Sequence, residues 1–184
     1  MLYRVFPFRP GARTNAEGGA LFVARHLQGL GRHDNPGQFG VLYASRDPES
    51  GVAELLARFR GQELTARDLR RADGLAYAVA ELDDAPLGAV ADLDDPNELA
   101  ARALRPSAVA THDRDTTQSM ALRLHAEGLA GFAWWSTLEA SWINVSLFAE
   151  RAVPLLGVGG EPNVLSVGSP LVQRVAAVLG VGLG

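Results

Sequence analysis

The sequence predicts a single α+β domain in which helices pack against a mixed sheet. Segments with strand and helix patterns alternate irregularly, and several predicted strands follow one another directly along the chain. This order favours a mixed sheet over a regular doubly wound one. The 184 residues contain no internal repeat and no long linker, so we expect one domain over 1–184.

The first part of the chain is expected to form a strand, a helix and a second strand. Residues 2–6 alternate in polarity as an edge or half-buried strand does, and Pro7 and Pro10 are expected to end that strand. Residues 17–30 carry apolar side chains loosely at helical spacing and are followed by Gly31. Residues 39–45 (FGVLYAS) have the pattern of a buried strand.

A helix with clear end signals follows. Asp47 and Pro48 predict its N-terminus, because aspartate caps free backbone N–H groups and proline fits the first helical position. Gly61 is expected to end it, just after Arg60. Its apolar residues recur at helical spacing, at Val52, Leu55, Leu56 and Phe59.

The second half is expected to contain four strands and three helices. The strands are 74–82, 131–135, 142–148 and 163–167. A short helix begins at Pro96, and a last helix covers 170–179. Asp115 and Gln118 resemble a capping box that opens the remaining helix. The glycine-rich residues 157–160 lack the context of a dinucleotide-binding turn and are predicted to be a loop.

The composition excludes several kinds of chemistry. The chain has no cysteine, which excludes disulfides, thiolate nucleophiles and zinc–thiolate sites. All 17 basic residues are arginine, which excludes a Walker-type phosphate loop, a Schiff-base enzyme and a lysine general base. The four histidines do not have metal-binding spacing, so we expect no metal site.

Charge and hydropathy limit the surroundings of the protein. The net charge of −4 and the scattered arginines argue against a nucleic-acid surface. No apolar run approaches the length of a membrane span, and the N-terminus lacks the pattern of a signal peptide. We therefore expect a cytoplasmic protein, which the absence of cysteine also fits.

Two candidate binding residues lie in and after a loop rich in glycine, asparagine and proline. Arg32 has a planar guanidinium suited to bidentate contact with a pyrophosphate, although a surface position beside a turn is an equally simple interpretation. Tyr43, inside an apolar strand, could stack on a flat ring or pack in the core. Arg4, on the first strand, could contribute to the same site or point to solvent.

Two further candidates are a carboxylate and a hydroxyl. Glu54 falls opposite the apolar stripe of its helix, which predicts a solvent-facing side chain unless a loop or strand forms a cleft there. Its competitors are Glu63, Glu81 and Glu139. Ser136 follows two tryptophans at a strand end without a nucleophile elbow, which favours hydrogen bonding over nucleophilic attack.

Two blocks of sequence carry a family resemblance. Residues 31–54 (GRHDNPGQFGVLYASRDPESGVAE) and 128–150 (GLAGFAWWSTLEASWINVSLFAE), with the opening LYRVF, resemble the RES domain. This domain is the toxin component of bacterial RES–Xre toxin–antitoxin pairs. The resemblance implies a fold similar to that of ADP-ribosyltransferases. It also implies that NAD is consumed as a substrate, without a separate cofactor.

The resemblance also assigns roles to the candidate residues. Arg32, with Arg4, is expected to hold the pyrophosphate, and Tyr43 to position the ring. Glu54 is expected to stabilise the charge that develops on the ribose, and Ser136 to bond the nicotinamide amide or a ribose. The implied reaction is cleavage of the nicotinamide–ribose bond, with water (NAD glycohydrolase), inorganic phosphate (NAD phosphorylase) or a protein side chain (ADP-ribosyltransferase) as acceptor.

A small Xre-like antitoxin is the implied protein partner. Trp134, Trp135 and Trp142 are candidate anchors for it, although a core position is the simpler interpretation of each. A first alternative is a non-catalytic RES-like domain that binds a nucleotide or a partner. It is favoured by His33, which stands where the family often has an aromatic residue. A second alternative is a small hydrolase that uses Ser136 with His112.

Overall fold

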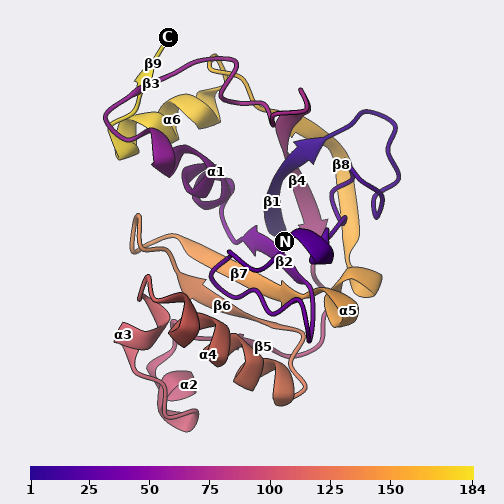
Figure 1. The fold of residues 1–184 in the computed structure, drawn as a ribbon, viewed down its shortest axis with the longest axis vertical. Helices are drawn as coiled ribbons and strands as arrows, with labels where there is room; N and C mark the ends of the chain where they lie inside the picture. Colours follow the sequence, from indigo (N-terminus) through magenta and orange to yellow (C-terminus); the bar gives the residue numbers. More distant parts are fainter.

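The computed structural model describes residues 1–184, and its elements surround one large curved sheet (Figure 1). The strands are β1 (Leu2–Phe8), β2 (Val41–Ser45), β3 (Glu63–Leu64), β4 (Ala76–Asp83), β5 (Val90–Asp92), β6 (Gly131–Trp135), β7 (Ile143–Phe148), β8 (Gly157–Val164) and β9 (Gly182–Leu183). The α-helices are α1 (Pro48–Leu56), α2 (Pro96–Ala101), α3 (Pro106–Val109), α4 (Arg114–Ala126), α5 (Ala149–Ala152) and α6 (Pro170–Leu179). Short 3₁₀ turns lie at Arg25–Leu27, Ala57–Phe59 and Val153–Leu155.

The large sheet confirms the predicted mixed topology. Its seven strands have the order β5-β6-β7-β2-β1-β4-β8, and β3 and β9 form a separate parallel pair. Within the large sheet only β5 and β6 run parallel. None of the helices has the length and apolar character that a membrane span requires.

Alternation along the strands divides the core between the two faces of the sheet. One face carries Leu42 of β2 and Leu147 of β7, and it is covered by α5 and the segment around Leu21. On the opposite face α1 and α6 pack over β1 and β4, whereas α4 packs over β5 and β6 (Figure 1). The middle of that face, over β2 and β7, lies between the two groups of helices.

Apolar burial places α1 beside this central region. Val52 and Leu56 are fully buried against Val172 and Val175 of α6. Each such side chain stabilises the fold by about 1.5–3 kcal/mol. Gly51 lets α1 approach the sheet, because a Cβ there would lie 3.1 Å from the Val5 side chain. The helix therefore presents its polar face to the middle of the sheet at short range.

Two predictions for the N-terminal part need correction. The first strand is half-buried, as one of the two interpretations had it, but it is central in the sheet and runs through Pro7 to Phe8. Its pairing with β2 is confined to Tyr3 opposite Ser45, so past that point one edge of β1 has no partner strand and tolerates proline. Residues 17–30 form no α-helix. They form a loop, in which the only helical element is the 3₁₀ turn Arg25–Leu27.

For residues 157–167 a strand is present, but its predicted bounds and the loop predicted at 157–160 are wrong. The strand begins at Gly157, inside the predicted loop, and ends at Val164. It is an edge strand that pairs with β4 through its backbone, and most of its side chains are exposed. An exposed edge strand does not need apolar alternation, so the first part of this strand, from Gly157, had no strand signal in the sequence.

The N-terminus of α4 differs from the predicted capping box. Asp113 caps the helix by accepting a hydrogen bond from the Asp115 N–H at 3.2 Å. Gln118 instead donates to the carbonyls of Gly29 (3.2 Å) and Gly31 (3.0 Å). The residue therefore holds a distant loop, a role that local spacing cannot reveal. The other predicted strands and helices are present, with ends shifted by a few residues.

Candidate active site

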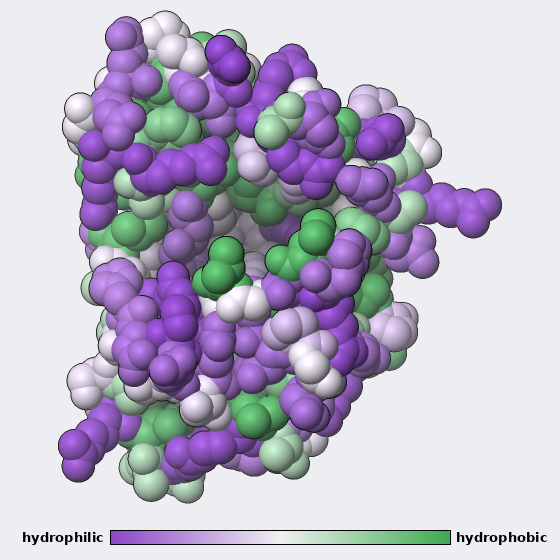
Figure 2. All heavy atoms as spheres, viewed as in Figure 1, coloured by the Kyte–Doolittle hydropathy of each residue, from purple (hydrophilic) through white to green (hydrophobic).

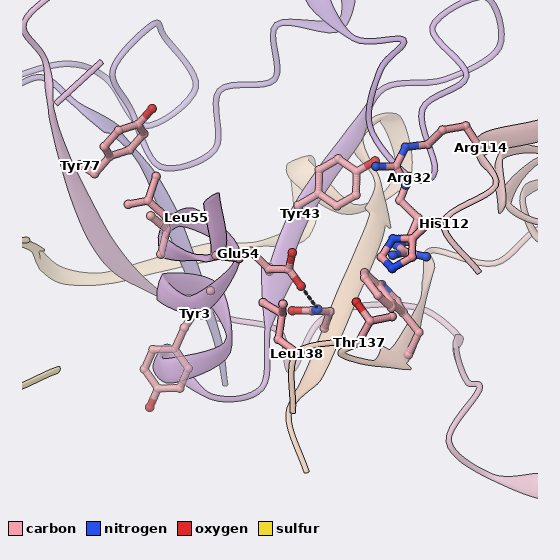
Figure 3. Close-up of a pocket in the computed structure, with 16 residues that line it drawn as sticks. Tyr3, Arg32, Tyr43, Glu54, Leu55, Tyr77, His112, Arg114, Thr137 and Leu138 are labelled. Carbon is pink, nitrogen blue, oxygen red and sulfur yellow. Dashed lines mark hydrogen bonds between the residues drawn. The ribbon is translucent and has the colours of Figure 1, made fainter. Parts of the chain in front are cut away.

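A cleft of about 510 Å³ lies between the two groups of helices, over the middle of the sheet (Figure 2). Its size is that of a typical small-molecule site. Of the five candidate site residues from the sequence, Arg32, Tyr43 and Glu54 line it, whereas Arg4 and Ser136 do not. Figure 3 shows cationic side chains at one end, the rings of Tyr3 and Tyr77 at the other, and Glu54 between them.

Glu54 reaches the cleft from the polar face of α1. Gly51, Glu54 and Leu55 are spaced as one helical face, and all three line the cleft. One carboxylate oxygen, Oε1, accepts hydrogen bonds from the Asn144 amide at 3.0 Å and from the Ser136 hydroxyl at 3.3 Å. The other oxygen has no partner within the protein. Glu54 is thus exposed, as its helix pattern predicts, and its exposed side faces a cleft.

Asn144 is a site residue that the sequence analysis did not identify. It is 5% exposed on β7, where its Oδ1 accepts a hydrogen bond from the Ser50 hydroxyl at 2.8 Å. That bond turns the amide NH₂ toward Glu54. The only signal in the sequence is an amide inside the apolar run of β7, and an isolated buried amide normally needs such partners.

Ser136 lies behind Glu54 and is not part of the cleft wall. Its side chain is 2% exposed, and its hydroxyl donates to Glu54 and accepts from the Leu138 N–H at 3.1 Å. The hydroxyl has no hydrogen bond to His112, which does line the cleft. A serine hydrolase needs a base in contact with its nucleophile, so the geometry does not fit the Ser136–His112 alternative.

Arg32 lies at the cationic end of the cleft. Its guanidinium donates to the carbonyl of Thr111 and lies 4.9 Å from the ring centre of Trp134. The backbone carbonyl of Arg32 accepts a hydrogen bond from the Thr117 hydroxyl of α4. Partial burial, followed by the nearby charge of Arg114, lowers the pKa of Arg32, which nevertheless stays a cation at neutral pH.

Asp34 organises the loop that carries Arg32. Its Oδ2 accepts hydrogen bonds from the N–H groups of Gly29 (2.8 Å) and Gly31 (2.7 Å), and its Oδ1 accepts the Tyr43 hydroxyl at 2.7 Å. A Cβ on Gly31 would lie 2.6 Å from the carboxylate oxygens, which these bonds hold in place. The loop therefore requires glycine at that position.

Tyr43 presents its ring to the cleft while its hydroxyl is engaged by the protein. The hydroxyl donates to Asp34 and accepts from the His33 N–H at 3.0 Å. Burial, followed by the Asp34 charge, raises the pKa of Tyr43 far above its ordinary value. A stacking role is therefore compatible with this geometry, whereas the hydroxyl is not free to act as an acid or a base.

His33 fills a buried aromatic position beneath the cleft. Its ring packs edge-on against Phe132 and Trp134, and its Nδ1 lies 2.8 Å from the Ser146 hydroxyl. The same hydroxyl accepts the indole N–H of Trp134 at 3.2 Å. Burial, then the charges of the nearby arginines, holds the pKa of His33 well below its ordinary value. The histidine is thus neutral and packs like the aromatic residue that the family resemblance leads one to expect.

Arg4 is not part of the cleft. It borders a separate cavity of about 270 Å³ on the other side of Tyr43. Its guanidinium donates to the carbonyls of Ala20 (2.6 Å) and Phe22 (2.8 Å), and burial lowers its pKa to about 10. The structure does not bring Arg4 together with Arg32, and the contacts of Arg4 hold the covering loop in place.

The three tryptophans, candidate anchors for a partner or core residues from the sequence, take mainly core positions. Trp134 is 4% exposed beneath Arg32. Trp135 and Trp142 are partly buried and pack against the core. No group of histidine, aspartate and glutamate side chains is arranged to hold a metal ion.

The fold and the site define a mixed-sheet domain whose cleft combines a carboxylate, cations and aromatic rings. The RES domain family model matches residues 1–159, so the chain belongs to the RES domain family. No curated protein matches the sequence. The fold is similar to that of a chain in the crystal structure of the M. tuberculosis MbcT–MbcA toxin–antitoxin complex. The TM-score is 0.63 at 18% identity, over 96% of this chain and 88% of that one.

Proposed function

We propose that this RES domain is a toxin that cleaves the bond between nicotinamide and ribose in NAD. The observation that carries the proposal is Glu54, whose unpartnered oxygen faces the middle of the cleft. Cations lie on one side of it and aromatic rings on the other. A carboxylate between an anion-binding end and a ring-binding end fits a charged ligand with a central sugar.

The chemistry follows from the leaving group. When the C1′–N bond breaks, its electron pair leaves with nicotinamide, which departs neutral, and positive charge develops on the ribose. A carboxylate below the ribose stabilises that charge, as carboxylates do in glycoside hydrolysis. A nucleophile then forms the new bond to C1′ and loses its proton.

The contacts of the site support a role for each residue. Arg32 would hold the pyrophosphate, and the Tyr43 ring would position the substrate. Ser136 and Asn144 act on the substrate through Glu54, because both donate to the same carboxylate oxygen. They are positioning residues, and they orient the free oxygen toward the cleft.

The direct test is release of nicotinamide from NAD by the purified chain, measured by chromatography with and without inorganic phosphate. ADP-ribose as the product identifies water as the acceptor, and a phosphorylated ADP-ribose identifies phosphate. Transfer of labelled ADP-ribose to added protein identifies an ADP-ribosyltransferase. Unchanged NAD under all three conditions would contradict the catalytic proposal and support a non-catalytic nucleotide-binding domain.

We propose a small antitoxin as the protein partner. The similarity in fold to a chain of a toxin–antitoxin complex supports this proposal, as does the need of a cell to restrain an enzyme that consumes NAD. A carboxylate of the antitoxin could pair with Arg32 and so occupy the place of the pyrophosphate. Expression of this chain alone should stop bacterial growth and deplete NAD. Growth equal to that with an empty vector would count against both the proposed toxin activity and the need for an antitoxin.

A further inference from the structure

The cationic end of the cleft contains a second arginine, which the sequence analysis did not identify. Arg114 is the first residue of α4 and lines the cleft beside Arg32 and His112 (Figure 3). The two guanidinium groups are close enough for the charge of Arg114 to contribute to the lowered pKa of Arg32. Two like charges thus share one wall of the cavity.

Neither guanidinium forms an ion pair, although the charge of Glu54 across the cleft raises the pKa of Arg32 and so partly opposes the lowering. Arg32 donates to a backbone carbonyl, and the guanidinium of Arg114 forms no hydrogen bond or ion pair with the rest of the chain. Five other arginines do pair with carboxylates on the surface, namely Arg25, Arg46, Arg71, Arg102 and Arg174. Two cations without ion-pair partners in a concave wall produce a positive potential that an anion relieves.

The position of Arg114 is unfavourable for the helix itself. The N-terminus of a helix is the positive end of its dipole, so a cation in the first turn costs stability there. Asp113 does not offset this by pairing with Arg114, because its carboxylate accepts from the Asp115 N–H and from the Thr116 hydroxyl. A contact with an anion in the cleft would compensate for this placement.

Hydrogen bonds fix the Arg32 loop to the first turns of α4. Thr117, three residues after Arg114, donates to the carbonyl of Arg32. The side-chain amide of Gln118 donates to the carbonyl of Gly31 at 3.0 Å, and the backbone carbonyl of Gln118 accepts from the Asn35 side-chain amide at 2.9 Å. The backbone positions that carry the two arginines are therefore set before any ligand arrives.

We propose that Arg32 and Arg114 form a two-arginine clamp for the diphosphate of a nucleotide, and that Arg114 makes the cleft prefer diphosphates over monophosphates. Two guanidinium forks can each make charge-assisted bonds to one phosphoryl group. Arg32, partly buried over Trp134, would hold a single phosphate by itself. The clamp rests on the proposed function and assigns the pyrophosphate of the dinucleotide to this end of the cleft.

The test is calorimetric binding of ADP-ribose and AMP, neither of which contains the bond to be cleaved. Arg114→Gln should weaken ADP-ribose binding by about tenfold to a hundredfold and AMP binding by less than about threefold. The matched control is Arg105→Gln, because Arg105 is also exposed and lies outside the cleft. It should change neither affinity, and thermal unfolding should show that both variants are folded.

The outcomes separate the clamp from the proposed reaction. An unchanged ratio of ADP-ribose to AMP affinity in Arg114→Gln would overturn the clamp, even if NAD cleavage were normal. Absence of ADP-ribose binding by the wild-type protein would overturn it as well. Binding that depends on Arg114, without release of nicotinamide from NAD, would support the clamp and overturn the proposed reaction.

Discussion

The two walls of the cleft are held by different forces. The wall that carries Glu54 is α1, which is fixed by burial of Val52 and Leu56 against α6. The wall that carries Arg32 is a loop, which is fixed by directional hydrogen bonds from Asp34 and Gln118. Burial has little directionality, whereas hydrogen bonds define angles. We call the α1 wall the apolar wall, because apolar burial fixes it, and the Arg32 loop the polar wall, because hydrogen bonds fix it. We expect the apolar wall to set the stability of the fold and the polar wall to set the geometry of the site.

The largest expected effect concerns the charge on the apolar wall. Glu54→Gln keeps the size of the side chain but removes the negative charge that would stabilise the ribose. Nicotinamide release should fall by at least about a hundredfold. The matched control is Glu49→Gln on the same helix, because Glu49 pairs with Arg174 at the surface, outside the cleft. If Glu54→Gln kept wild-type turnover, the role would belong to another carboxylate.

The next effect tests the burial that holds α1. Leu56→Ala removes a fully buried side chain from the α1–α6 core and should cost about 2–5 kcal/mol of unfolding free energy. Turnover per folded molecule should stay within about twofold of wild type. The control is Leu122→Ala on α4, where the side chain is 41% exposed and the cost should be below about 0.5 kcal/mol. Stability is measured by urea unfolding. Lost activity in fully folded Leu56→Ala would contradict the division of roles between the walls.

The sequence was sufficient for the part of the site that depends on local pattern. Arg32 lies in a loop, Tyr43 in the strand β2 and Glu54 in the helix α1, an order that the pattern predicts, and the family resemblance singled out these residues. The helical pattern of α1 correctly placed Glu54 on an exposed face. It could not show that a cleft lies there, because the opposite wall is distant in sequence.

The rest of the site depends on contacts that local pattern does not encode. Asn144 became visible only when β7 placed it beside Glu54. Arg114 has the appearance of an ordinary surface residue in a first helical turn, and only the fold brings it to Arg32. Gln118 was misread as a capping residue for the same reason, since its partners are 87 and 89 residues away.

A smaller effect tests the hydrogen bonds of the polar wall. Asp34→Asn replaces one carboxylate oxygen by an NH₂ group, which cannot accept from Gly29, Gly31 and Tyr43 together. Stability should fall by about 1–3 kcal/mol, and KM for NAD should rise because the loop loses its geometry. The control is Asp68→Asn, a loop carboxylate that holds Thr65 far from the cleft. A variant that lost the same stability with unchanged KM would show that the polar wall is only structural.

The smallest effect is a pH dependence that arises beneath the polar wall. The pKa of His33 is lower in the folded protein than its ordinary value of 6.5, because of burial and nearby arginines. Below pH 6.5 the unfolded chain therefore binds a proton that the folded chain does not, which favours unfolding. The stability of the folded state is therefore unaffected by the protonation of His33 above pH 6.5. As the pH falls from 6.5 toward the folded pKa, the free energy of unfolding decreases by up to about 1.4 kcal/mol per pH unit.

His33→Phe should remove this dependence while preserving the packing against Phe132 and Trp134. Ser146 would still accept the indole N–H of Trp134, so one of its two bonds remains. Urea midpoints at pH 7.5 and 5.0 give the loss of stability for each protein, and that loss should be smaller for the variant. His125, whose pKa is also lowered by burial, is present in both proteins and cancels in the comparison. Equal losses in the two proteins would mean that His33 is not the titrating group, and that the acid sensitivity of this wall has another source.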